Sequence, residues 1–185
     1  MLKRPNLDLV YSEGFADEIR SGNVEAKVRF VLAVGETPVL GPPPRAAKEF
    51  GVTYMNNLLQ GVLAAFDGAG HSACFAEDLT CLVFQPITGT DQVLLAEEMR
   101  SPKTEEMASP RSAVPASSEE FKGDFRWGVT DVYLLAAEFV STATQLHDRV
   151  VEVDQSCANH RFLTGLQESI DATRRAFKAR CTEDG

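Results

Sequence analysis

Basic residues are the minority among the charged side chains of this 185-residue chain. The 18 lysine and arginine residues face 27 aspartate and glutamate residues, which gives a formal net charge of −9. Nucleic acids and anionic membranes are bound mainly through basic patches, so the composition argues against both as partners. A basic partner protein fits this charge, and so does the simpler interpretation that the acidic surplus keeps the protein soluble.

Long apolar runs and cysteines are also scarce. No stretch of about 18 apolar residues occurs, so we expect no membrane-spanning helix. Lys3 and Arg4 are not followed by the apolar segment of a secretory signal. With no such signal, we expect a cytoplasmic protein whose few cysteines are thiols and not a disulfide scaffold. These are Cys74, Cys81, Cys157 and Cys181.

The common catalytic and cofactor motifs are missing. The chain has no glycine-rich dinucleotide or phosphate loop, no G-x-S-x-G nucleophile turn, no H-E-x-x-H zinc helix and no C-x-x-C redox pair. These absences favour a protein that is not an enzyme, although they leave room for an unfamiliar active site.

Alternation of apolar and charged side chains predicts the strands. It is clearest in residues 24–34, where one face is apolar and the other is charged in the first half. The apolar runs at 79–87 and 92–98 flank a glycine-containing loop, which is typical of a β-hairpin. Shorter strands are expected at residues 39–40 and 121–127.

Apolar residues at spacings of three and four predict four helices, at residues 12–20, 52–66, from Thr130 or Asp131 to about residue 150, and 159–180. Gly61 weakens the second helix by about 1 kcal/mol relative to alanine, and a closely packed neighbouring helix would explain it. The break between the last two helices is short, so we expect them to pack antiparallel.

This order predicts a single α+β domain over residues 1–185. We expect an antiparallel or mixed sheet of four to five strands with helices on one face and a C-terminal antiparallel helix pair. Residues 1–6 are expected to form a loose tail. Residues 101–120 contain three prolines, five serines and no aromatic residue, which predicts a mobile loop.

Histidine and cysteine recur in two places that could combine into one metal site. His71 and Cys74 are three apart, and so are Cys157 and His160. Two histidines and two cysteines are a tetrahedral zinc set, so zinc is the cofactor this alternative requires. The simpler interpretation is that the cysteines pack as small apolar residues and that no cofactor is bound. A second alternative makes Cys157 a nucleophile, with His147 or His160 as its base and Asp148 or Asp154 orienting that base.

Aromatic residues and an arginine gather after the serine-rich loop, at Phe121, Phe125, Arg126 and Trp127. Tryptophan and arginine are frequent anchors of protein interfaces, although a single tryptophan is more often a core residue. These residues are therefore the candidate interface.

In composition and layout the chain resembles the small acidic immunity proteins and secretion chaperones of bacteria, without a shared residue motif. The resemblance implies a protein-binding module (an inhibitor, immunity-type protein, chaperone or adaptor) whose partner is another protein, and a basic one fits best. The alternative is an enzyme or ligand-binding protein with a Cys/His site, and the C-terminal helices could also form a homodimer.

Overall fold

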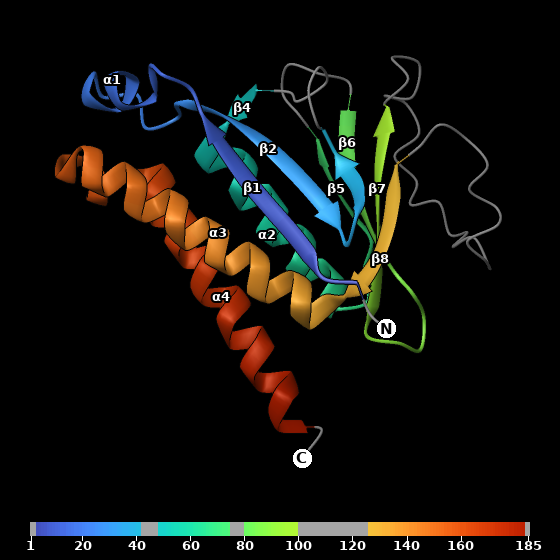
Figure 1. Cartoon of the computed structure of the whole chain (residues 1–185). Helices are drawn as coiled ribbons and strands as arrows, with labels where there is room; N and C mark the ends of the chain where they lie inside the picture. Colours follow the sequence, from blue (N-terminus) through green and yellow to red (C-terminus); the bar gives the residue numbers. More distant parts are fainter. Residues whose placement is uncertain (1–2, 42–47, 75–79, 100–125, 184–185) are drawn as a thin grey trace, which may run out of the picture.

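The computed structural model describes residues 3–41, 48–74, 80–99 and 126–183, and Figure 1 shows their arrangement. The chain is an α+β protein with antiparallel strands and a C-terminal helix pair, as predicted. The elements follow in the order β1 (Pro5–Tyr11), α1 (Phe15–Arg20), β2 (Lys27–Val34), β3 (Thr37–Leu40), β4 (Lys48–Phe50), α2 (Gly51–Phe66), β5 (His71–Cys74), β6 (Thr80–Pro86), β7 (Gln92–Met99), β8 (Trp127–Asp131), α3 (Val132–Val153), a 3-10 helix η1 (Gln155–Asn159) and α4 (Arg161–Glu183).

The described strands form two four-stranded sheets in place of the single sheet of four to five strands that we expected. In sheet A, β1 pairs with one edge of β2, while β3 and β4 both pair with β2. In sheet B the order is β5-β6-β7-β8, and every pair is antiparallel. The alternation that predicted a strand at 24–34 produces β2, whose residues are buried at every second position.

Strand β1 corrects the expectation of a loose N-terminal tail, because Pro5 and Asn6 already pair with β2. The outer edge of β1 is closed by α3. The Leu7 N–H donates to Glu138 Oε1 at 2.9 Å, and the Thr142 hydroxyl donates to the Leu7 carbonyl at 3.3 Å. Side chains from a helix far along the chain thus satisfy both backbone groups of Leu7 on an edge that would otherwise be open to pairing.

The predicted hairpin is confirmed as β6 and β7, which are joined by a turn with Gly89 at a φ of 77°. Strand β8 lies later in the chain than the short strand expected at 121–127, and residues 121–125 of that prediction are outside the described ranges. The mobile loop expected at 101–120 is also outside them.

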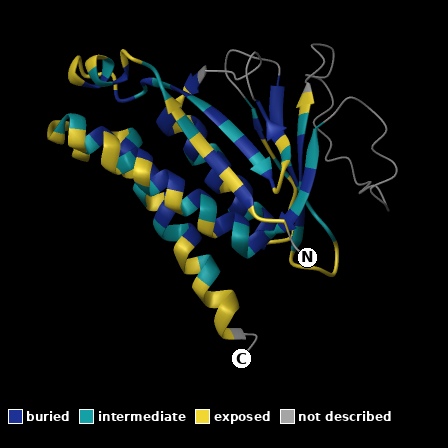
Figure 2. Cartoon of the chain, viewed as in Figure 1, coloured by how far each residue is buried: buried dark blue, intermediate teal, exposed yellow. Residues whose placement is uncertain are grey.

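Helix α2 is the centre of the molecule, and Figure 2 shows that most of its length is buried. Gly61 allows α2 to pack closely against β6, because a Cβ atom at this position would lie 2.6 Å from Cε2 of Phe84 on that strand. The close neighbour that we expected is therefore a strand residue and not a helix. The Phe84 ring in turn meets the ring of Phe139 on α3, with centroids 6.2 Å apart.

Helices α3 and α4 run in opposite directions on the side of α2 away from sheet B (Figure 1). Asp131, one of the two residues predicted to begin this helix, is the N-cap of α3, and its carboxylate accepts from the Tyr133 and Leu134 N–H groups at 2.8 and 3.1 Å. The last turns of α4 project from the body and are exposed (Figure 2). Within the described ranges, no helix has the length and apolar character needed to cross a membrane.

Candidate functional site

A cleft of about 320 Å³ opens at the C-terminal end of α2. We call it the α2 cleft. Its lining comes from the end of α2 (Phe66 and Asp67), the turn between β6 and β7 (residues 86–92), the start of α3 (Val132 and Tyr133) and one residue of α4, Arg180. This volume is at the lower end of the range of small-ligand pockets, about 300–1,000 Å³.

The end of α2 presents carbonyl groups toward this cleft. Three of the last four helical carbonyls accept backbone N–H groups from the turn that follows: Leu63 from Asp67 at 3.2 Å, Ala65 from Gly68 at 3.1 Å and Ala64 from Ala69 at 2.8 Å. The remaining carbonyl, that of Phe66, accepts a hydrogen bond from the Arg180 guanidinium. A side-chain cation thus sits at the negative end of the α2 dipole.

Two carboxylates line the same cleft as this guanidinium. Asp67 and Asp91 both line the cleft and are exposed to solvent. Asp131 lies next to the lining residue Val132 and is engaged in capping α3. The cleft lining therefore carries two carboxylates and one guanidinium, one more negative than positive charge.

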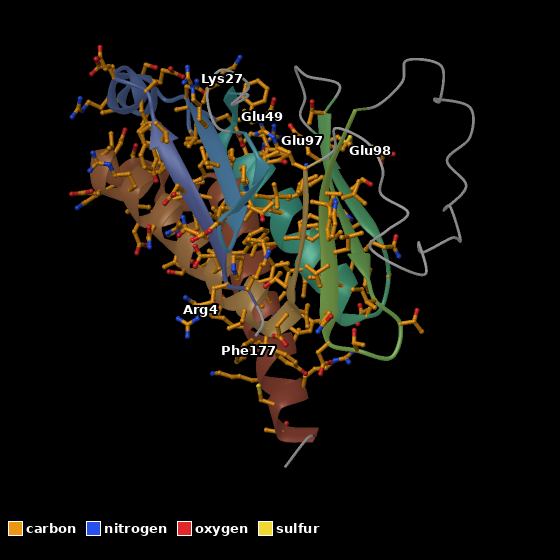
Figure 3. All side chains as sticks on the ribbon, turned by 45° about the vertical axis from the view of Figure 1, so that its right-hand side comes forward. Arg4, Lys27, Glu49, Glu97, Glu98 and Phe177 are labelled. Atoms are coloured by element: carbon orange, nitrogen blue, oxygen red, sulfur yellow. A yellow bond between two sulfur atoms is a disulfide. The ribbon has the colours of Figure 1, made fainter. Side chains whose placement is uncertain are left out.

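Aromatic rings form one wall of the α2 cleft. The Tyr133 ring meets the Phe66 ring edge-on at a centroid distance of 5.6 Å and the Phe177 ring at 5.7 Å. Phe177 lies near the projecting end of α4, as Figure 3 shows. The lining of the α2 cleft thus combines exposed carboxylates with aromatic rings, two kinds of group that attract guanidinium and ammonium ions.

The structure does not bring the predicted zinc ligands together. Cys74 forms a disulfide with Cys81, so its sulfur is committed to another partner and the expectation that both are thiols is contradicted. Cys157 is a free and buried thiol in η1, and His160 follows η1 as its C-cap. His71 begins β5, where burial lowers the pKa of its imidazole. No group of three or more histidine, cysteine or acidic residues in the described ranges is arranged to hold a metal ion.

The reactivity expected of Cys157 also finds no support in its surroundings. Burial, followed by the nearby Asp154 carboxylate, raises the pKa of the thiol. Raising the pKa reduces the thiolate fraction at neutral pH, which is the opposite of what a catalytic cysteine requires.

Of the candidate interface residues, Phe121 and Phe125 lie outside the described ranges. Trp127 begins β8 opposite Ala96 and is half-buried. Arg126 precedes it, and its carbonyl accepts from the Glu97 N–H at 3.0 Å. The Nη1 atom of Arg126 is buried and has no hydrogen-bond partner among the described residues.

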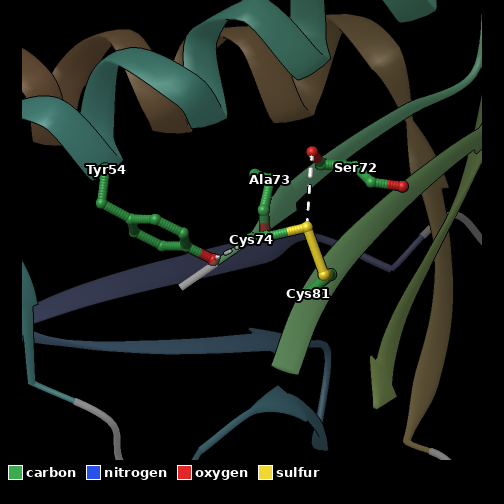
Figure 4. Close-up of a disulfide and its surroundings, with 5 residues drawn as sticks. All are labelled: Tyr54, Ser72, Ala73, Cys74 and Cys81. Carbon is green, nitrogen blue, oxygen red and sulfur yellow. Dashed lines mark hydrogen bonds between the residues drawn. A yellow bond between two sulfur atoms is a disulfide. The ribbon is translucent and has the colours of Figure 1, made fainter. Parts of the chain in front are cut away.

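A second polar cluster lies near the start of α2, where the buried Glu49 and the half-buried Glu97 act electrostatically on the buried Tyr54. Figure 3 shows Glu49 and Glu97 close together. Burial, and then the two carboxylates, raise the pKa of the Tyr54 hydroxyl well above its ordinary value. The hydroxyl therefore stays protonated and donates to the Ala73 carbonyl at 3.4 Å (Figure 4). This group fastens β5 to α2 and is a hydrogen-bond donor, not a nucleophile.

Sequence patterns did not reveal either the α2 cleft or this cluster. The signals available for the cleft were the turn residues Asp67-Gly68 and Thr88-Gly89-Thr90-Asp91. These residues predict where the chain reverses, but they do not predict that the two turns lie close together in the fold. Glu49 carries no local signal, because its burial depends on strand pairing with β2.

No protein-family model, curated protein or solved structure matches this chain significantly.

Proposed function

We propose that this protein is a protein-binding module, of the inhibitor, immunity-type, chaperone or adaptor kind, and that it binds a basic segment of its partner in the α2 cleft. The observation that carries the proposal is the Arg180 guanidinium on the Phe66 carbonyl, in a cleft that Asp67 and Asp91 also line. The cleft thus already holds one guanidinium group, that of Arg180, and a guanidinium is the kind of group that it would recognise in a basic partner.

The expected strength of each contact favours a protein partner over a small amine. A cation at a helix C-terminus contributes about 0.3–1 kcal/mol, and an exposed ion pair contributes about 0–1 kcal/mol. Binding at micromolar concentration requires about 8 kcal/mol. A single ammonium or guanidinium group therefore falls short, whereas a segment with several basic residues and apolar contacts does not.

The net charge of −9 supports the same choice. An acidic protein attracts a basic partner over distances of about a Debye length, roughly 8 Å at physiological salt, and so accelerates the encounter. The association rate should fall as salt is added, while the dissociation rate changes less.

Arg180 has a double role in this account. It caps α2, and it also occupies the place that a partner cation would take. Removing its charge by Arg180→Gln should therefore strengthen the binding of a basic segment, whereas removing an acid from the cleft should weaken it.

A fluorescence anisotropy titration with an arginine-rich peptide of about ten residues tests the proposal. We expect the double variant Asp67→Asn/Asp91→Asn to bind about tenfold more weakly than the wild type, which lies within the limit of about 2 kcal/mol for two exposed ion pairs. Glu168→Gln is the matched control, since Glu168 is exposed on α4 and is not among the residues that line the cleft. A peptide that binds the wild type and the double variant equally would refute a role for the cleft.

A further inference from the structure

Cys74 and Cys81 form a covalent link between two neighbouring strands. Cys74 is the last residue of β5, Cys81 is the second residue of β6, and the two are direct partners in the antiparallel register. Their sulfur atoms are bonded, as Figure 4 shows. The disulfide therefore joins the end of β5 to the strand on which it lies.

Apart from the disulfide, the contacts that hold strand β5 are noncovalent. It is four residues long, and β6 is the only described strand with which it pairs. The Tyr54 hydroxyl supplies one bond from α2, to the Ala73 carbonyl at 3.4 Å. A short strand at the edge of a sheet opens readily, so the disulfide is the strongest constraint on this end of β5.

The two sulfur atoms differ in access. Cys81 is 2% exposed, whereas Cys74 is half-buried next to the exposed Ser72. An external thiolate would therefore reach the sulfur of Cys74 first. Tyr54 and Ala73 lie on the other side of the strand, toward the core.

We infer that Cys74 and Cys81 are a reversible redox pair that fastens β5 to β6 when oxidised and releases the end of β5 when reduced. The reductant is a dithiol, either a small molecule or a protein. Its thiolate attacks the sulfur of Cys74, the Cys74–Cys81 bond breaks, and the electron pair leaves on the sulfur of Cys81, which takes up a proton. The second thiol of the reductant loses its proton and displaces Cys74 from the mixed disulfide, so the protein gains two thiols and the reductant becomes a disulfide.

This inference goes beyond the proposed function and does not depend on it. The disulfide joins β5 and β6 on sheet B, and neither cysteine is among the residues that line the α2 cleft. Peptide binding in the cleft and redox behaviour at β5 can therefore be measured separately.

The test uses the full chain with Cys181→Ser, because Cys181 is an exposed free thiol that could form intermolecular disulfides. The protein is equilibrated in buffers with different ratios of reduced to oxidised dithiothreitol, and alkylated cysteines are counted by mass spectrometry after denaturation. We expect one alkylated cysteine, Cys157, in the oxidised buffer and three in the reduced buffer, with full reversal when the buffers are exchanged.

Amide hydrogen exchange then measures the structural consequence. In the reduced protein we expect exchange at residues 71–74 to be at least tenfold faster, with α2 and α3 unchanged. The variant Cys74→Ser should match the reduced protein in either buffer. Thiols that persist at Cys74 and Cys81 in the oxidised buffer, a disulfide that dithiothreitol does not reduce, or equal exchange of β5 in both states would each overturn the inference.

Discussion

Replacing Gly61 by alanine tests how α2 packs on sheet B. Gly61 is in the interior of α2, and a Cβ atom there would lie 2.6 to 2.7 Å from three ring atoms of Phe84. The ring cannot retreat easily, because Phe84 is fully buried and is packed against Phe139. The methyl group must therefore displace either α2 or β6.

Two opposing terms set the size of the effect. Alanine gains about 1 kcal/mol over glycine in helix propensity. Forcing an extra methyl group into a packed core costs about 1–3 kcal/mol. We therefore expect Gly61→Ala to be destabilised by up to about 2 kcal/mol.

Gly165 on α4 offers a matched control, because a Cβ atom added there would meet no described neighbour within 4 Å. Gly165→Ala should therefore be stabilised by about 1 kcal/mol through the higher helix propensity of alanine, without the steric cost. The two variants should differ by about 1–3 kcal/mol in the free energy of unfolding measured by urea titration. In a thermal scan, each kcal/mol of this difference corresponds to a shift of about 2–4 °C in the Tm. If Gly61→Ala is stabilised as much as Gly165→Ala, the contact between α2 and Phe84 is wrong.

Three further outcomes are expected. Asp131→Ala should lower the free energy of unfolding by about 1 kcal/mol in urea titrations, because two N–H groups at the start of α3 lose their acceptor. Burial holds the pKa of His71 below its ordinary 6.5, so the unfolded chain binds the proton first and stability should fall as pH drops below about 6.5. His71→Gln should lose less stability between about pH 7.5 and 5.5 than the wild type, and an equal loss would contradict this assignment. Iodoacetamide should modify the exposed Cys181 of the native protein much faster than Cys157, because burial and then the Asp154 carboxylate raise the pKa of the Cys157 thiol. Peptide mapping measures both rates, and similar rates would show that η1 is open to the reagent.

Much of the secondary structure follows from local patterns. The alternation at residues 24–34 produced β2, and Asp131 indicated the start of α3 because an aspartate that precedes an apolar helical repeat is a strong N-cap. Gly61 correctly indicated a close neighbour. The identity of that neighbour depends on how β6 packs on α2, which no local signal contains.

The missed features depend on contacts between distant segments. The alternation of Leu7, Leu9 and Tyr11 was a signal for β1, but this pattern is short and follows a proline. The hydrogen bond from the Leu7 N–H to Glu138 on α3 joins β1 to a helix far along the chain, and no local pattern predicts it. Strand β5 is too short for a periodicity.

The cysteine pairing and the cleft were missed for the same reason. Cys74 and Cys81 pair because the register of β5 and β6 places them opposite each other. The α2 cleft combines residues from the end of α2, a turn, the start of α3 and the end of α4. Each of these lining residues is ordinary in its own segment, so only the fold shows that they line one cleft.

The proposed binding of a basic partner segment in the α2 cleft can be tested on the native partner itself. The most direct measurement is affinity capture from extract of the native source, at low salt, with the wild type, Asp67→Asn/Asp91→Asn and Glu168→Gln in parallel, followed by the affinity of each chain for the captured protein. We predict that one partner with a basic segment is recovered by the wild type and by Glu168→Gln, and that the double variant binds it about tenfold more weakly. Equal affinity for all three chains, or no partner for any of them, would contradict the account.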